Sequence, residues 1–271
     1  VIKGNEAFST GVETRLQSVF GDEIWLKLER AGITADRISE LDVLEVCAGT
    51  GFLTFHLLSR SNPKSFAVND ISQNEMAFSK QLIDEHLPQT KIDWILGDLH
   101  TVSFNRKYDL IIGNSFIHHF HNVPQVLARI QQLLNPGGVF ITLHEPTPMA
   151  IVVESAKILT WPLAALTPRF VVNLARARYK GQPSATDLWL FESEPLRQIA
   201  LQAGFKLADF YAWGLIRPFI FQRKGLHLSE DKPRLSNDEA QIFQKAVKID
   251  SILNNFLPIR CFGSICVAFR K

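Results

Sequence analysis

A glycine-rich turn between an expected strand and an expected helix constrains this chain more than any other feature. Residues 43–46 are apolar except Glu45, the turn Ala-Gly-Thr-Gly follows at 48–51, and an apolar helical pattern begins at Phe52. Glycine lets the backbone approach a ligand without a Cβ in the way, and the free N–H groups of a helix start point at that ligand. The sequence therefore predicts a ligand-binding loop on an α/β sheet.

Two details separate this loop from a dinucleotide-binding fingerprint. The third glycine of the G-x-G-x-x-G pattern would fall at Thr54, and an acidic residue, Glu45, stands just ahead of the turn. A carboxylate at that place repels a pyrophosphate. It favours a ligand without phosphate and with a cationic end, and S-adenosylmethionine, with its sulfonium and ammonium groups, fits that description.

With these features the chain resembles the class I S-adenosylmethionine-dependent methyltransferases, whose first motif is an acidic residue followed by a glycine-rich turn. The resemblance covers about residues 41–142 and continues more weakly to the C-terminus. The family usually has glycine at the position of Cys47, and a thiol-bearing side chain is expected to narrow the loop. The resemblance implies S-adenosyl-L-methionine as the cofactor, held in this loop by Glu45, Ala48, Gly49 and Gly51.

A second cofactor contact is predicted where the strand expected over 65–69 ends at Asp70 and Ile71. Asp70 follows the glycine turn by one helix and one strand, so its carboxylate is expected to accept hydrogen bonds from both ribose hydroxyls. The alternative is that Asp70 only caps the next helix. Ser72 and Glu75 already form a capping box there, which leaves Asp70 free.

The resemblance assigns two further strand ends to the cofactor. In the family, an acidic residue after the third strand receives the adenine amino group, and the next backbone N–H meets the ring. Asp98 and Leu99 match these positions, with a surface turn as the alternative. After the fourth strand, family members hold the methionine moiety at the positions of Asn114 and Ser115. An Asn-Pro-Gly-Gly turn at 135–138 is a frequent feature of the same family.

The alternation of strands and helices predicts one α/β domain. We expect a doubly wound, mostly parallel seven-stranded sheet with helices on both faces, and the resemblance implies an antiparallel last strand. The expected parts of residues 1–271 are an N-terminal helical segment (1–40), a cofactor-binding half (41–146), a helical insertion after the fifth strand (147–195) and a C-terminal helix-strand portion (196–271). The insertion is apolar and is interpreted as a lid over an apolar acceptor, with a packed decoration or a dimer contact as the alternative.

Three histidines are candidates for a general base, namely His118 and His119 after the fourth strand and His144 at the end of the fifth. A histidine near its unperturbed pKa of about 6.5 can take a proton from a hydroxyl. The alternatives are packing against the sheet for the first two, and strand-end capping for His144 and its neighbour Glu145, which are expected to face one crevice. Consecutive histidine side chains diverge and no acidic cluster completes a metal site, so no metal is expected.

Composition limits which binding partners and which cellular compartment are expected for this protein. The net charge of the 271 residues is +2, which is too small to predict nucleic acid as a partner. Three cysteines without metal-ligand spacing fit a reducing cytoplasm, and no signal peptide or bilayer-spanning stretch is recognised. The basic and aromatic residues of 217–232 are interpreted either as a peripheral contact with a membrane or an anionic acceptor, or as a solvated loop. Monomer and homodimer both stay open.

These features together predict an enzyme that transfers a methyl group from S-adenosylmethionine to a small, apolar acceptor. Oxygen is the first choice for the accepting atom, and nitrogen or carbon is the alternative. Two competing classes are a relative that binds the cofactor without methylating, of pericyclase or decarboxylase type, and an interaction module without cofactor.

Overall fold

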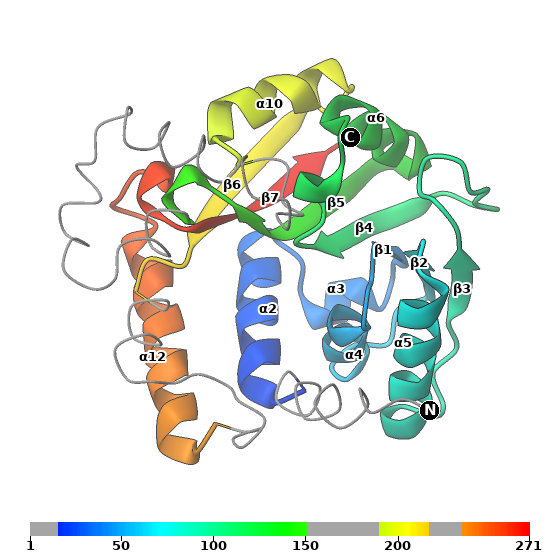
Figure 1. The fold of residues 1–271 in the computed structure, drawn as a ribbon, viewed down its shortest axis with the longest axis horizontal. Coiled ribbons are helices and arrows are strands. Elements are labelled where there is room, and N and C mark those ends of the chain that lie inside the picture. Colours follow the sequence, from blue (N-terminus) through cyan, green and yellow to red (C-terminus); the bar gives the residue numbers. More distant parts are fainter. Residues whose placement is uncertain (1–15, 151–189, 217–234) are drawn as a thin grey trace.

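The computed structural model describes residues 16–150, 190–216 and 235–271 (Figure 1). The strands are β1 (Asp42–Val46), β2 (Ser65–Asp70), β3 (Asp93–Leu96), β4 (Tyr108–Asn114), β5 (Leu134–Pro146), β6 (Leu207–Trp213) and β7 (Ser264–Arg270). The helices are α2 (Ser18–Arg30), α3 (Ala35–Ile38), α4 (Phe52–Leu58), α5 (Gln73–His86), η1 (Ile117–His119), α6 (Val123–Leu133), α10 (Ser193–Gln202), α12 (Asn237–Leu253) and η2 (Ile259–Cys261). Within these residues, no helix has the length and apolar character needed to cross a membrane.

The seven strands form one sheet in the order β3-β2-β1-β4-β5-β7-β6. β1 pairs in parallel with both β2 and β4, whereas β7 is antiparallel to β5 and β6. The strand order reverses at β1, and a sheet of this kind binds ligands beyond the carboxyl ends of the strands at such a reversal. The predicted fold, including the antiparallel last strand, is confirmed. Most of the predicted lid, and the loop 217–232, lie outside the described residues.

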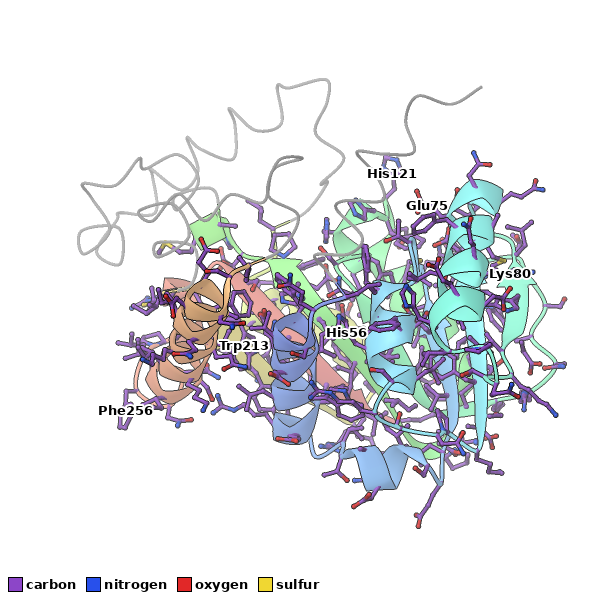
Figure 2. The ribbon with its side chains drawn as sticks, turned by 90° about the horizontal axis from the view of Figure 1, so that it is seen from below. His56, Glu75, Lys80, His121, Trp213 and Phe256 are labelled. Carbon is purple, nitrogen blue, oxygen red and sulfur yellow. The ribbon has the colours of Figure 1, made fainter. Side chains whose placement is uncertain are left out.

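Helices cover both faces of the sheet, and each face has its own apolar core (Figure 1). One core packs α2, α4 and α12 against the sheet and contains Trp25 and Leu57. The other packs α6 and α10 against it and contains Ile130 and Leu196. Figure 2 shows Trp213, the last residue of β6, between α2 and α12. This side chain joins the two helices to the antiparallel end of the sheet.

The central strands are buried on both faces, as parallel strands between two helix layers must be. In β4, Leu110 and Ile112 belong to the core beside α2, and Ile111 belongs to the core beside α6. Successive side chains of a strand point to opposite faces, so a strand covered on both sides needs apolar residues at every position. This double burial explains the apolar run that predicted the strand.

Local capping signals set several helix starts, which the patterns Ser72-x-x-Glu75, Asn122-x-x-Gln125 and Ser236-x-x-Glu239 predict. Ser236 forms a reciprocal capping box with Glu239 at α12. The side chains of Ser72 and Asn122 accept backbone hydrogen bonds at the starts of α5 and α6. These starts are confirmed because each cap depends only on residues close in sequence.

Two strands begin at other residues than the apolar runs 139–143 and 259–269 predict for them. β5 begins at Leu134, because Leu134 pairs with Tyr108 before the register shifts along β4. The Pro-Gly-Gly turn is therefore part of an irregular strand start. The last strand begins at Ser264, because residues Ile259–Cys261 form the turn η2. The first difference depends on a pairing partner that is distant in sequence.

A buried carboxylate joins α12 to the end of β6. Asp250 is 1% exposed and accepts hydrogen bonds from the backbone N–H groups of Gly214 (3.1 Å), Leu215 (3.2 Å) and Ile216 (2.7 Å). Buried N–H groups need an acceptor, and no regular strand partner is available after the strand ends. Asp250 therefore fixes the path of the chain as it leaves the sheet.

We expect Asp250→Ala to lower the free energy of unfolding by about 3 kcal/mol, because it leaves buried N–H groups without this acceptor. Urea unfolding followed by circular dichroism measures the change. Gln241→Ala, at an exposed position of the same helix, is the control and should stay within about 0.5 kcal/mol of the parent protein. Equal effects of the two substitutions would contradict the role of Asp250.

Candidate functional site

Three non-glycine residues with left-handed backbone conformations lie at the carboxyl ends of adjacent strands. Cys47 follows β1 (φ 53°), Ser115 follows β4 (φ 55°), and His144 lies near the end of β5 (φ 58°). Such a conformation costs roughly 1–3 kcal/mol for a residue with a side chain, and it concentrates at functional sites. Here the strained positions mark the sheet edge at which the strand order reverses.

The glycine-rich turn between β1 and α4 lies at this edge. Gly49 (φ 54°) and Gly51 (φ 79°) are also left-handed. A Cβ at position 51 would lie 2.1 Å from Ser79 Oγ of α5, so only glycine lets α4 begin against that helix. At position 49 a Cβ would meet no heavy atom of the described residues within 4 Å. Ala48 anchors the turn by donating its N–H to Asn69 O (3.2 Å). The turn is therefore firmly held and, among the residues that the structure describes, open above Gly49.

Glu45 lies beneath the turn and not on its open side. Its side chain is buried, and its Oε2 accepts a hydrogen bond from Thr54 Oγ1 (2.6 Å). Burial raises the pKa of Glu45 to about 8, although the Thr54 hydroxyl favours the ionised form. The carboxyl group is therefore mainly protonated at neutral pH. The sequence analysis assigned a negative charge to Glu45. A cation close to the carboxyl group is needed to lower its pKa enough for that charge to form.

The Asp70 carboxylate ties the end of β2 to the turn. Its Oδ2 accepts a hydrogen bond from the Gly49 N–H (2.8 Å), and its Oδ1 accepts one from the Ser72 N–H (2.8 Å). Asp70 was expected to be free because Ser72 caps α5. The serine side chain does cap the helix, but its backbone N–H is still available and bonds to Asp70. Each carboxylate oxygen has a further lone pair, so these bonds are compatible with the predicted ribose contacts.

The other predicted cofactor residues lie at the ends of β2, β3 and β4. Ile71 is 71% exposed and offers an apolar surface beside Asp70. Asp98 Oδ1 accepts the His100 N–H (2.9 Å) in a local turn, and the Leu99 side chain is buried in the core beside α6. Asn114 is exposed at the end of β4, and the Ser115 N–H donates to a β5 carbonyl. The structure thus brings the predicted cofactor residues of four adjacent strands to one edge.

His118 is held inside the protein by a buried carboxylate. Glu145 accepts hydrogen bonds from the backbone N–H groups of Phe116 and Ile117 (both 3.1 Å), from Thr142 Oγ1 (2.5 Å) and from His118 Nδ1 (2.7 Å). Both Glu145 and His118 are buried. The carboxylate accepts, so Nδ1 of His118 carries a proton. This geometry fixes η1 against β5 and does not favour His118 as a base.

His119 and His144 lie in different surroundings. His119 is exposed, and its ring centroid lies 4.0 Å from that of His118. His144 Nδ1 lies 2.7 Å from Asn114 Oδ1. The expectation that His144 and Glu145 face one crevice is wrong, because their side chains contact different elements, α2 and η1. A register irregularity of β5 against β7 lies between Thr142 and Glu145, and it turns the two neighbours apart.

Sequence reasoning missed Glu23 and Lys27, whose side chains on α2 also reach His144. Lys27 Nζ lies 2.7 Å from Glu23 Oε1, and Lys27 and Glu23 are 0% and 4% exposed. Lys27 Nζ contacts His144 Nε2, which lies 3.1 Å from Glu23 Oε1. The sequence did contain a signal for this ion pair. An acidic and a basic residue lie four positions apart on the face of the helix that also carries the apolar Val19 and Leu28.

Comparisons with known proteins agree with this geometry. Residues 44–140 match a family model described as methyltransferase domain. The malonyl-[acyl-carrier protein] O-methyltransferase of Priestia megaterium is 31% identical over 100 residues, which are 36% of this chain and 35% of that protein. The enzyme of the same name from Neorickettsia risticii is 35% identical over 165 residues, which are 52% of this chain and 64% of that protein. The matched part of this chain therefore covers about a third of the length of the first relative and less than two thirds of the length of the second.

A solved S-adenosylmethionine-dependent methyltransferase from Mesorhizobium loti has the same fold. It aligns with a TM-score of 0.58 over 93% of this chain and 100% of its own, at 13% identity, which establishes the fold alone. With the strand order, this places the fold among those of the class I S-adenosylmethionine-dependent methyltransferases, and residues 44–140 match a methyltransferase domain.

The buried carboxyl of Glu45 predicts a pH dependence of stability. Its pKa is raised from its ordinary value of 4.5 to about 8, so between these values the native state binds a proton that the unfolded chain has released. Stability from this group is therefore lost as the pH rises. Glu45→Gln removes the effect. We expect the stability of this variant relative to the parent to increase by about 3 kcal/mol from about pH 5.5 to 8.5.

Urea unfolding of both proteins at several pH values measures the difference between their free energies of unfolding. The contributions of the other titrating groups are the same in both proteins and cancel in this difference. Glu40→Gln, at an exposed position, is the matched control and should show a pH-independent difference from the parent. A pH-independent difference for Glu45→Gln as well would show that the carboxyl is ionised in the native protein.

Proposed function

We propose that this protein is an enzyme that binds S-adenosylmethionine over the carboxyl ends of β1 to β4 and transfers its methyl group to an oxygen of a small, apolar acceptor. The observation that carries the proposal is the convergence of four strand ends on the open glycine turn, with Asp70 bonded to the Gly49 N–H (2.8 Å). The match of residues 44–140 to a methyltransferase domain supports the reaction type.

The donors and acceptors at this edge suit such a cofactor better than a phosphate-bearing nucleotide. The residues proposed to hold it include the carboxylates of Asp70 and Asp98 and the amide of Asn114, and none of them is basic. Carboxylates bind hydroxyl and amino groups and repel phosphate. Ile71, largely exposed beside Asp70, adds apolar surface for the face of a base.

The cofactor supplies a methyl carbon that is already activated by the sulfonium charge. The task of the protein is therefore to hold acceptor and methyl in line, which contributes about 7–11 kcal/mol, whereas a general base adds about 10²–10⁴-fold, or roughly 3–5 kcal/mol. His118 and His144 have ring nitrogens bonded to Glu145 and Asn114. His119 lies on η1 and is exposed, and for its exposure we take it as the first of the three to test as the group that meets an acceptor proton.

Oxygen as the accepting atom is supported by the names of the two relatives, which are both O-methyltransferases of malonyl-[acyl-carrier protein]. The apolar character of the acceptor is supported by the composition of 147–195, most of which lies outside the described residues. A carrier-bound malonyl group tests the oxygen acceptor, and a lipid extract tests the apolar one.

Incubation with methyl-labelled S-adenosylmethionine and malonyl-acyl carrier protein, with a lipid extract in parallel, tests the reaction. Labelled product that alkali releases as methanol identifies a methyl ester, as expected. Alkali-stable product would move the accepting atom to nitrogen, carbon or an ether oxygen. Cofactor binding without product from either acceptor source or from cell extract would favour the non-methylating class.

We expect S-adenosylhomocysteine to stabilise the protein by about 2.7 kcal/mol at a hundredfold excess over its dissociation constant, because it binds only the native state. Thermal unfolding with and without the ligand measures the effect. NAD at the same concentration is the control and should have no effect. Stabilisation by NAD alone would contradict the assignment of the cofactor.

Asp70→Asn keeps an oxygen acceptor at this position but removes the charge proposed to face the ribose. Charge-assisted hydrogen bonds contribute about 1.5–3 kcal/mol, so the affinity for S-adenosylhomocysteine should fall roughly 10- to 100-fold. Isothermal calorimetry measures it. Asp36→Asn, at an exposed position of α3, is the control. Unchanged affinity of a folded Asp70→Asn protein would place the ribose elsewhere.

A further inference from the structure

A continuous series of polar contacts runs from the buried face of α2 to the proposed cofactor edge. We name it the polar chain, and its members are Glu23, Lys27, His144 and Asn114. Lys27 Nζ lies 2.7 Å from Glu23 Oε1 and contacts His144 Nε2. The other ring nitrogen, His144 Nδ1, lies 2.7 Å from Asn114 Oδ1. The ion pair of α2 is thereby connected to the end of β4.

These contacts determine which ring nitrogen of His144 carries a proton. The amide oxygen of Asn114 only accepts hydrogen bonds, so the Nδ1–H of His144 donates to it. Two groups lie at Nε2, the Lys27 ammonium and, at 3.1 Å, Glu23 Oε1. The ammonium is the nearer of the two and only donates, so Nε2 accepts from it, and the proton of the ring is on Nδ1. A proton on Nε2 in place of Nδ1 would direct an N–H group at the Lys27 ammonium and would leave Nδ1 with nothing to donate to the Asn114 oxygen.

Burying the ion pair between Glu23 and Lys27 is an energetically unfavourable way to stabilise a helix. Lys27 is 0% exposed and Glu23 is 4% exposed, and Lys27 Nζ also lies 5.0 Å from the centroid of the Trp213 ring. Charges that leave water lose their hydration, and apolar residues of similar volume usually stabilise a core equally well or better. The arrangement therefore points to a role at the far end of the polar chain.

That far end is the exposed amide of Asn114. Its oxygen faces His144, so its two N–H groups are directed away from His144. Asn114 ends β4 beside β1 and directly precedes the strained Ser115, at the reversal of strand order. Two N–H donors suit an anionic acceptor such as a carboxylate. The amide turned by 180° would present its oxygen and repel that group.

We infer that Glu23 and Lys27 are positioning residues that act through His144. They hold the imidazole in its Nδ1–H form, and the imidazole holds the Asn114 amide with its N–H groups toward the carboxylate of the bound cofactor. The inference rests on the proposed function, because the ligand is S-adenosylmethionine or its demethylated product. It assigns to α2, which lies outside the matched residues 44–140, a part in cofactor binding.

The test compares the parent protein with the double variant Glu23→Met/Lys27→Met, which replaces the buried ion pair by apolar side chains. The control is Asp22→Asn/Arg60→Met, which removes a partly exposed ion pair between the same helix and Arg60. Urea unfolding measures stability, and calorimetry measures S-adenosylhomocysteine affinity. Long-range ¹H–¹⁵N spectra of protein with labelled histidine report the His144 tautomer, assigned with His144→Gln.

We expect the double variant to unfold at the same or a higher urea concentration than the parent, and yet to bind S-adenosylhomocysteine at least tenfold more weakly. Its His144 should lose the single Nδ1–H form seen in the parent. The control should keep both the affinity, within threefold, and the His144 signature.

Other outcomes overturn the inference. Parent-like affinity in the double variant, or a parent His144 protonated on Nε2, would remove the positioning role and leave the proposed function intact. Loss of affinity only in proportion to loss of folded protein would show that the ion pair is purely structural. A parent protein that does not bind S-adenosylhomocysteine would overturn the proposed function as well.

Discussion

The parallel pairing of β1 with both β2 and β4 is the constraint on which the rest of the structure depends. It requires helices on both faces of the sheet, because parallel strands are connected by crossovers and buried on both sides. It also places the carboxyl ends of neighbouring strands side by side at the point where the order reverses. The glycine turn, Asp70 and Asn114 meet there for this reason alone.

Buried ionisable groups are concentrated around this edge. Glu145 holds η1 through backbone N–H groups, Glu45 lies under the glycine turn with a pKa raised to about 8, and the ion pair of α2 reaches His144. Burial of such groups costs stability unless each is hydrogen-bonded. Together with three left-handed non-glycine residues, they show a site at which local stability is given up for a defined arrangement of polar groups.

This arrangement bears on how the proposed methyl transfer would be achieved. Under that proposal, the hydrogen-bonded histidines and the amide of Asn114 orient ligands, and orientation is the larger contribution available to a displacement at an activated carbon. Hydrogen bonds of Asp70 connect β2 to the glycine turn, and those of Glu145 connect β5 to η1.

The sequence by itself determined the class of fold and the residues that meet at the edge. Apolar runs such as that of β4, caps such as Ser236 and the glycine turn are local signals, which act between residues close in the chain. It did not determine that Asp70 bonds to the Gly49 N–H, that His144 and Glu145 turn apart, or that Lys27 reaches His144. Those contacts join residues on different elements or at a strand irregularity, and only packing in three dimensions decides which polar groups meet when water is excluded.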